Sequence, residues 1–192
     1  MDFSPSFVSA FKFTMRYEVG PNFNFDDPVT QSGKCSTKAE QKKTGYSCIA
    51  GDEGGETKFG IAKNANPDVD IKSLNLREAM TIYYNRYWIP LGCEHYDFPL
   101  AVNVFDAGVN HGVVGASKML QKAVNALVDG QVGKKTIEAT KTFNSLVICD
   151  KILKSREDLF LSIVSRKPSQ AKFLKGWLNR LASIKAYIAS QK

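Results

Sequence analysis

Residues 5–18 of the chain read PSFVSAFKFTMRYE, a segment whose apolar side chains have the spacing of one helical face. Phe7, Phe11 and Met15 follow one another at intervals of four residues, and Glu18 stands three residues further on. At about 100° per residue, Glu18 returns to within roughly 20° of the direction of Phe7. The segment therefore predicts a helix that carries an acid where its next core residue would stand.

The position of Glu18 leaves two interpretations open. An acid on an apolar face is costly unless it is paired or protonated, and desolvation raises the pKa of a carboxyl group toward the range of a general acid. Glutamates near helix ends are common, however, and most of them are solvated. Periodicity alone therefore does not separate a catalytic role from a surface role.

The composition is that of a soluble globular protein. The chain has 192 residues, of which 43% are hydrophobic and 23% are charged. Its sequence contains no apolar run near the length of about 20 residues that a membrane span needs. The first residues, MDFSPSFVSAFKF, lack a basic region and a cleavage site. We therefore expect synthesis in the cytoplasm without a secretory signal.

Positive charge is concentrated at the C-terminal end. Residues 151–192 hold ten Lys or Arg residues against Glu157 and Asp158, which gives this segment a charge of +8. The whole chain has a net charge of +7, so the remaining residues sum to about −1. A basic third favours a polyanionic partner such as an anionic cell-envelope surface, although a solvated helical surface has the same composition. We do not expect nucleic acid as a partner, because neither a helix-turn-helix nor an interleaved aromatic motif accompanies the charge.

The four cysteines do not have the spacing of a metal site, so we expect neither a metal nor another cofactor. Cys35 and Cys48 flank one polar loop. A disulfide between them is open as an alternative to two thiols, and the redox compartment decides between the two.

The pattern of elements predicts a mainly α, α+β protein. Apolar periodicity predicts a helix over residues 75–88, with Asn75 and Glu78 at capping-box spacing and Tyr87 in its buried stripe. Further helices are predicted over residues 99–112, 114–127, 134–143, 145–164 and 170–190. Residues 21–56 form a long polar stretch that we interpret as a functional loop, in which residues 46–49 are a candidate hairpin strand.

A glycine-rich segment follows that loop. Residues 51–61 read GDEGGETKFGI, in which Asp52 and Thr57 bracket a pair of glycines that predicts a strand bend. Together with Glu18, Asp52 would provide the two carboxyl groups of a glycosidase. One of them protonates the leaving oxygen, and the other activates water or stabilises the positive sugar ring.

The order of these motifs resembles that of the peptidoglycan-cleaving muramidases of glycoside hydrolase family 108, many of which are phage endolysins. The family pattern runs E-G-G, then Asp-Pro, then D-P-G-G-x-T-x-x-G-I. Here it becomes Glu18-Val19-Gly20, Asp27-Pro28 and residues 52–61, and residues 87–91 resemble a following Y-W-x-P-L. The second half is similar to the family's peptidoglycan-binding region at residues 106–110, 120–121, 129–133 and 173–180.

This resemblance implies a lysozyme-like fold, with a catalytic helix and a small β-hairpin region packed on a helical bundle. It implies a muramidase region over residues 1–97 and a helical peptidoglycan-binding region over residues 98–192, packed into one monomeric globule. The activity it implies is hydrolysis of the β-1,4 bond between N-acetylmuramic acid and N-acetylglucosamine, with Glu18 as general acid. Such an enzyme acts on the cell wall in the periplasm, after release through a holin or another route.

The chain departs from the family pattern at the second carboxylate. Val19 replaces a glycine, Glu53 replaces a proline, and residues 29–50 resemble an insertion between two motif halves. Asp52 fits the motif spacing, and Thr57 would hold the water that it activates. Asp27 is the rival second carboxylate, because its separation from Glu18 resembles that of the acid pair of phage-type lysozymes. Glu53 and Glu56 are weaker candidates.

Two other functions fit the same residues. A lytic transglycosylase also uses one glutamate, but it forms a 1,6-anhydro sugar without adding water. A non-catalytic peptidoglycan-binding protein would keep Glu18 only as an acid at the edge of the core. The mass of the released fragments separates the first alternative from hydrolysis, and binding to sacculi without lysis would indicate the second.

Overall fold

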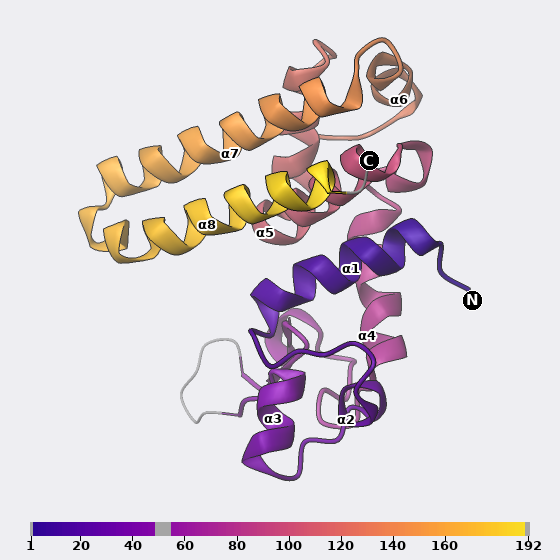
Figure 1. Cartoon of the computed structure of the whole chain (residues 1–192), viewed down its shortest axis with the longest axis vertical. Helices are drawn as coiled ribbons and strands as arrows, with labels where there is room; N and C mark the ends of the chain where they lie inside the picture. The colour runs from indigo at the N-terminus through magenta and orange to yellow at the C-terminus, as the bar shows by residue number, and fades with distance from the viewer. Residues whose placement is uncertain (1, 49–54, 191–192) are drawn as a thin grey trace. The chain divides into compact units, whose positions relative to one another are not determined.

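The computed structural model describes residues 2–48 and 55–190 of the chain (Figure 1). Contacts divide the chain into two compact units, one formed by residues 1–10 with 85–192 and the other by residues 11–84. The predicted boundary after residue 97 stays a prediction. None of the described helices is long and apolar enough to cross a membrane.

Helix α1 (Pro5–Glu18) confirms the predicted opening helix. The Ser4 hydroxyl oxygen accepts a hydrogen bond from the Phe7 backbone N–H at 3.3 Å, as expected of an N-cap. Phe7, Phe11 and Met15 are all fully buried, which confirms the apolar face. Glu18 ends this face as the last residue of the helix, and it is half-buried.

The polar stretch after α1 is more ordered than predicted, because it contains two short helices, α2 (Pro28–Ser32) and α3 (Lys38–Thr44). The first has an N-cap at Asp27, and the second has a complete capping box between Thr37 and Glu40. Helices of this length show no apolar periodicity, so their capping residues were the only signal in the sequence.

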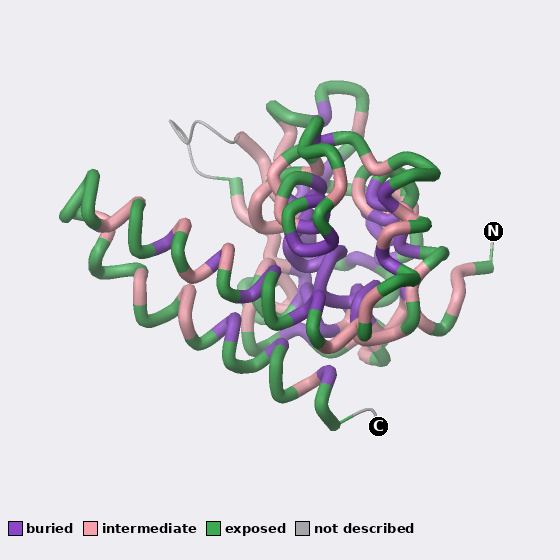
Figure 2. The backbone as a smooth tube through the Cα atoms, turned by 90° about the horizontal axis from the view of Figure 1, so that it is seen from above, coloured by how far each residue is buried: buried purple, intermediate pink, exposed green. Residues whose placement is uncertain are grey.

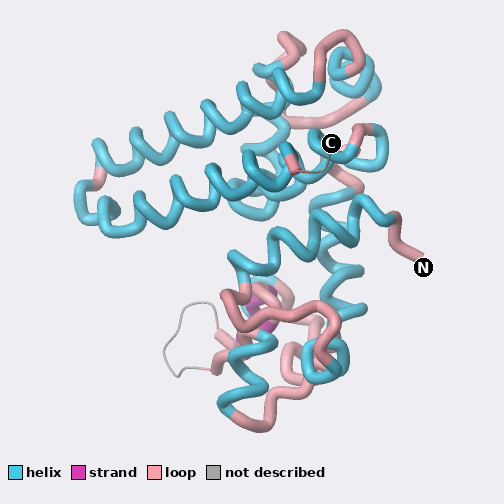
Figure 3. Tube along the Cα trace, viewed as in Figure 1, coloured by secondary structure: helices cyan, strands magenta, loops and turns pink. Residues whose placement is uncertain are grey.

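A two-stranded antiparallel hairpin, β1 (Thr57–Lys58) and β2 (Ile61–Ala62), follows the undescribed residues 49–54 (Figure 3). Phe59 and Gly60 form its two-residue turn, and both have positive φ angles, 50° and 72°. This combination is typical of the type I′ turn that suits tight hairpins. Of the candidate strand over residues 46–49, the described part contributes one bridge, between Ser47 and Thr57.

Lys58 anchors the hairpin from within. Its side chain is fully buried, and its Nζ atom donates a hydrogen bond to the Lys72 carbonyl oxygen at 2.7 Å. Desolvation lowers the pKa of Lys58. The next turn, η1 (Lys63–Ala65), leads into an irregular segment that ends at α4 (Leu76–Tyr83).

Helix α4 begins with the predicted capping box between Asn75 and Glu78. It continues as a π-helical turn, η2 (Tyr84–Trp88). The wider turn changes which side chain faces inward, so the prediction of Tyr87 in the buried stripe was wrong. Tyr87 is half-buried, and Trp88 is fully buried instead.

The unit formed by residues 1–10 and 85–192 is helical. In order, its elements after η2 are η3 (Cys93–His95), α5 (Phe98–Ala123), α6 (Lys134–Thr140), α7 (Ser145–Arg166), η4 (Pro168–Gln170) and α8 (Ala171–Ala189). Helices α7 and α8 form an antiparallel hairpin, with buried residues recurring along both (Figure 2). The two helices predicted over residues 99–112 and 114–127 are the two arms of α5, which meet at a kink at Gly112. The φ of 76° and ψ of 159° at this residue are not helical, and glycine adopts them readily.

Three aromatic rings form the centre of this helical unit. Phe7, Trp88 and Phe105 meet edge to face, with ring centroids 5.3 to 5.7 Å apart. All three side chains are fully buried. Such pairs stabilise a core beyond the area that they bury.

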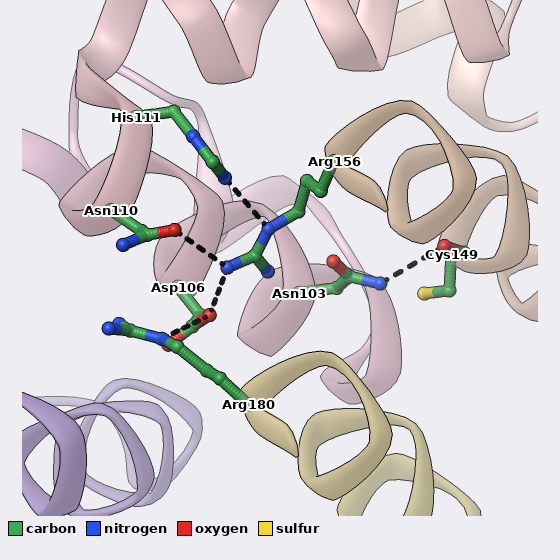
Figure 4. Close-up of polar contacts among 7 residues, drawn as sticks. All are labelled: Asn103, Asp106, Asn110, His111, Cys149, Arg156 and Arg180. Carbon is green, nitrogen blue, oxygen red and sulfur yellow. Dashed lines mark hydrogen bonds and ion pairs between the residues drawn. The ribbon is translucent and has the colours of Figure 1, made fainter. Parts of the chain in front are cut away.

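A buried ionic network lies in the same unit (Figure 4). Asp106 is fully buried and accepts hydrogen bonds from Arg156 and Arg180, each at 2.8 Å. Burial opposes the charge of Asp106, but the two guanidinium groups hold the pKa of its carboxyl group below the ordinary value. The Nε2 atom of His111 accepts a hydrogen bond from Nε of Arg156 at 3.1 Å. Two family marks noted in the sequence, residues 106–110 and 173–180, therefore contribute to the scaffold of this unit.

Candidate active site

The end of α1 lies directly against the turn of the β-hairpin. A Cβ atom added at Gly60 would lie 3.2 Å from Cβ of Glu18 and 3.8 Å from its Cγ. The backbone of the hairpin therefore approaches the stem of Glu18 more closely than a residue with a side chain would allow. This explains the glycine of the T-x-x-G motif, which has both a positive φ and a neighbour at the Cβ position.

Tyr83 holds the other side of this turn. Its hydroxyl group donates a hydrogen bond to the Phe59 carbonyl oxygen at 2.9 Å, and its ring packs edge to face on Phe11 at 5.4 Å. The same hydroxyl oxygen would lie 2.6 Å from a Cβ atom at Gly60. The sequence did not reveal this polar contact, because helical periodicity says nothing about where a buried hydroxyl group points.

Phe59 shows how firmly the turn is held. It is fully buried although its φ of 50° is unusual for a residue other than glycine. Its backbone N–H donates to the Thr44 carbonyl oxygen at 2.8 Å, while its own carbonyl oxygen accepts from Tyr83. These contacts keep the hairpin turn in place beside Glu18.

Thr57 lies on β1 of the same hairpin, where it exchanges two backbone hydrogen bonds with Ser47, at 2.8 and 2.9 Å. Its hydroxyl group donates to the Gly55 carbonyl oxygen at 3.4 Å. The side chain is half-buried. The structure thus brings Glu18 and the hairpin of Thr57 into one unit, while the role predicted for Thr57 stays a prediction.

Asp27, the rival second carboxylate, caps α2. Its Oδ1 atom accepts hydrogen bonds from the backbone N–H groups of Val29 and Thr30, at 2.9 and 3.3 Å. Its Oδ2 atom accepts one from Nζ of Lys43 at 2.7 Å. The bond from Lys43 and the two backbone bonds lower the pKa of Asp27, because all three favour the charged carboxylate.

The remaining acids of the predicted site are Asp52, Glu53 and Glu56. Asp52 and Glu53 lie outside the described residues. Glu56 accepts a hydrogen bond from the Tyr46 hydroxyl group at 2.6 Å, and this bond raises the pKa of Tyr46. Glu56 thus has a bonded partner within its own unit.

The described residues contain no group of three His, Cys, Asp or Glu side chains that could hold a metal ion. Cys35 and Cys48 are separate thiols, of which the first is buried and the second is exposed. The Sγ atom of Cys35 lies 3.9 Å from the Lys72 carbonyl oxygen, which is also the acceptor of Lys58.

Comparison with known proteins defines the class of this chain. Residues 38–112 match the family described as Glycosyl hydrolase 108, and residues 115–182 match the one described as Predicted Peptidoglycan domain. A glycosidase module followed by a peptidoglycan module defines a glycoside hydrolase that acts on peptidoglycan. The first match confirms the resemblance to the glycosyl hydrolase 108 family that the motif order predicted. Glu18 lies before the matched segment.

The fold has a relative among solved structures. SagA of Brucella abortus superimposes with a TM-score of 0.63 at 24% identity, over 76% of this chain and 86% of that one. This similarity confirms the predicted fold, which is mainly α with a small β-hairpin and lysozyme-like. A search of the curated proteins finds no match.

Proposed function

We propose that the protein is an N-acetylmuramidase that hydrolyses the β-1,4 bond between N-acetylmuramic acid and N-acetylglucosamine, with Glu18 as its general acid. The observation that supports this role is the close approach of the glycine hairpin to Glu18 at the end of α1. An acid there has a buried apolar helix face behind it. The partial negative charge of a helix C-terminus also disfavours a further negative charge, which favours the protonated form that a general acid needs.

The reaction needs two carboxyl groups. Glu18 donates its proton to the glycosidic oxygen as the bond to the sugar breaks. Asp52, placed by the D-x-G-G-x-T spacing, activates or positions the water, and the Thr57 hydroxyl group helps to hold that water. The proton of the water passes to the base, so the products are two sugar ends with one water added.

The contacts of Asp27 support Asp52 as the second carboxylate. Both oxygens of Asp27 already accept hydrogen bonds, from two backbone N–H groups and from Lys43. A carboxylate with a lowered pKa and a paired charge is a weak base for water. Asp27 is better explained as the residue that starts α2.

The experiment that tests this proposal uses purified sacculi and Glu18→Gln. We expect lysis to fall by about a hundredfold to ten-thousandfold, the usual contribution of a general acid, with the melting temperature unchanged. Glu138→Gln is the control, because Glu138 is an exposed acid paired with Lys141 at 2.9 Å. Undiminished lysis by Glu18→Gln would reject the assignment.

The mass of the fragments separates the alternative reactions. Hydrolysis leaves a reducing N-acetylmuramic acid end, whereas a lytic transglycosylase leaves a 1,6-anhydro end that is lighter by one water. Binding of the wild type to sacculi with no fragments released would instead indicate a non-catalytic peptidoglycan-binding protein.

We also propose that the α7–α8 hairpin contacts an anionic surface of the cell envelope. Its bend carries Arg166, Lys167, Lys172 and Lys175, all exposed, and no acidic residue follows Asp158 in the sequence. Attraction between such a cluster and an anionic surface is screened by salt. Binding to sacculi or anionic vesicles should therefore weaken steeply as ionic strength rises. In this proposal the protein acts monomerically on the wall, as an endolysin would after release into the periplasm.

A further inference from the structure

A hollow of about 420 Å³ lies in the unit that carries Glu18. Val19, the residue directly after Glu18, forms part of its wall, and α3 supplies much of the remainder. Its lining includes Val19, Asn22, Lys38, Gln41, Lys42 and Tyr46. The hollow is therefore lined by the residue that directly follows the proposed general acid in the chain.

Close packing fixes α3 against the end of α1. The helix starts with a capping box, in which Thr37 and Glu40 exchange hydrogen bonds of 3.2 and 2.9 Å. It ends at Gly45, whose φ of 64° is left-handed and at which a Cβ atom would lie 3.2 Å from Cγ1 of Val19. Side chains on α3 thus have a defined position relative to the residue that follows Glu18.

Tyr46 completes a defined wall. Its hydroxyl group donates to Glu56 at 2.6 Å, which holds the ring at the base of the hollow beside Gly45. The hollow is consequently a formed feature of the fold, with polar side chains on a rigid frame.

Among the described residues that line the hollow, the charged side chains are both lysines. Lys38 and Lys42 are one helical turn apart, both are exposed, and across residues 2–48 and 55–190 neither forms an ion pair. Lys43, the neighbouring residue, is by contrast paired with Asp27 at 2.7 Å. Like charges at this spacing repel each other, so a bound anion between them would be stabilising.

The substrate offers such an anion close to the bond that is cut. The two sugars of a peptidoglycan strand carry neutral N-acetyl groups, whereas the peptide on the muramic acid carries carboxylates. We infer that Lys38 and Lys42 bind a carboxylate of this peptide stem, so that the enzyme prefers peptide-bearing glycan to bare glycan. The inference rests on the proposed function and names the part of the substrate that the site recognises.

The experiment compares two substrates, sacculi and the same glycan strands freed of peptides by an amidase. In the second substrate the lactyl carboxylates that the amidase exposes are converted to neutral amides, so that the bare strands carry no anion. Cleavage is followed by the appearance of reducing ends. For Lys38→Ala/Lys42→Ala we expect kcat/KM on the peptide-bearing glycan to fall about threefold to tenfold, as suits two exposed ion pairs. On bare strands we expect little change, so that the preference of the wild type disappears.

The controls separate charge recognition from structure. Lys118→Ala/Lys122→Ala removes an exposed pair at the same helical spacing in α5, and it should leave the preference intact. Lys38→Arg/Lys42→Arg should retain it as well, and a thermal melt checks that each variant is folded. The charge-reversed variant Lys38→Glu/Lys42→Glu should lower cleavage of the peptide-bearing glycan further than Lys38→Ala/Lys42→Ala does.

The inference would be overturned by a preference that survives in Lys38→Ala/Lys42→Ala, or by an equal loss on both substrates. In either case the proposed function would stand, because cleavage of bare strands by the wild type and its loss in Glu18→Gln test that function separately. A wild type with no preference for the peptide-bearing glycan would also contradict the inference.

Discussion

Two acids in the two units of this protein stand in opposite surroundings. Asp106, in the helical unit, is fully buried and is bonded by two arginines. Glu18, in the unit of the hairpin, is half-buried at a helix end, with a glycine backbone close to its stem. The first acid has its charge matched inside the fold. The second lies beside the turn of the hairpin.

The difference distinguishes an acid that is paired inside the fold from the acid that we propose as catalytic. A buried carboxylate whose oxygens are matched by guanidinium groups cannot change its protonation state without cost to the fold. Glu18 ends a helix, where the partial negative charge of the helix C-terminus favours the protonated form that a general acid needs. Three changes would break or sharpen this comparison.

The largest effect on stability is expected for Asp106→Ala. The substitution leaves Arg156 and Arg180 buried without their counter-ion, and breaking a buried pair in this way costs about 3–5 kcal/mol. Urea unfolding of the whole protein measures the loss. Asp150→Ala is the matched control, because Asp150 is exposed and pairs with Lys185 at 2.8 Å, and its loss should be below about 1 kcal/mol. Similar values for the two variants would contradict a structural role for the network.

A smaller effect, shared between stability and activity, is expected for Gly60→Ala. The new methyl group would meet the Tyr83 hydroxyl oxygen at 2.6 Å and adopt a left-handed φ of 72°, so we expect a loss of about 1–3 kcal/mol. The rate of lysis should fall by more than the loss of folded protein explains, because the same methyl group displaces Glu18. Gly176→Ala in α8 is the control, since no atom lies within 4 Å of its added Cβ and alanine suits a helix better by about 1 kcal/mol. Unchanged lysis in Gly60→Ala would argue against the hairpin as part of the site.

The smallest effect is a dependence of stability on pH through His111. Burial, followed by the charge of Arg156, lowers the pKa of His111 from 6.5 to about 4 in the folded protein. As pH falls from 6.5 toward 4, the unfolded chain takes up a proton that the folded chain does not, so stability is present above this window and is lost within it. Because the ring of His111 is only half-buried, solvent screens its charge, and the change in the free energy of unfolding is correspondingly smaller.

The comparison of wild type with His111→Gln isolates this group. Both proteins should lose stability in acid as their carboxylates titrate, but the melting temperature of the wild type should fall more steeply between pH 6.5 and 4. Parallel curves for the two proteins would show that His111 does not contribute.

Much of the fold could be predicted from local patterns. The apolar spacing of α1 and the capping box of α4 each depend on residues that are close in the chain. The bend predicted at the paired glycines before Thr57 lies partly outside the described residues, and the observed hairpin turn is at Phe59 and Gly60. Helices α2 and α3 were missed because they are too short to show a period. Tyr87 was assigned to the core wrongly, because the π-helical turn after Tyr83 shifts the inward face by one residue.

In the candidate site, too, some features could be predicted from the sequence and others depend on the fold. The motif spacing was enough to select Glu18 and Thr57, and to put Asp52 and Asp27 forward as second carboxylates. The capping of α2 by Asp27, the contact of Gly60 with Glu18 and the hydroxyl group of Tyr83 on the turn could not be read from spacing. Each of these depends on segments that are brought together by folding.

The sequence by itself determined the resemblance to the glycosyl hydrolase 108 family, the opening helix and the acid at its end, because periodicity and motif order are properties of neighbouring residues. Only the tertiary structure decided that Asp106 is neutralised by two arginines from α7 and α8. It also decided that the hairpin of Gly60 approaches Glu18, and that two lysines, with no ion pair to any described residue, line a hollow beside it. The physical reason is that burial, pairing and close approach depend on distances between residues far apart in the chain.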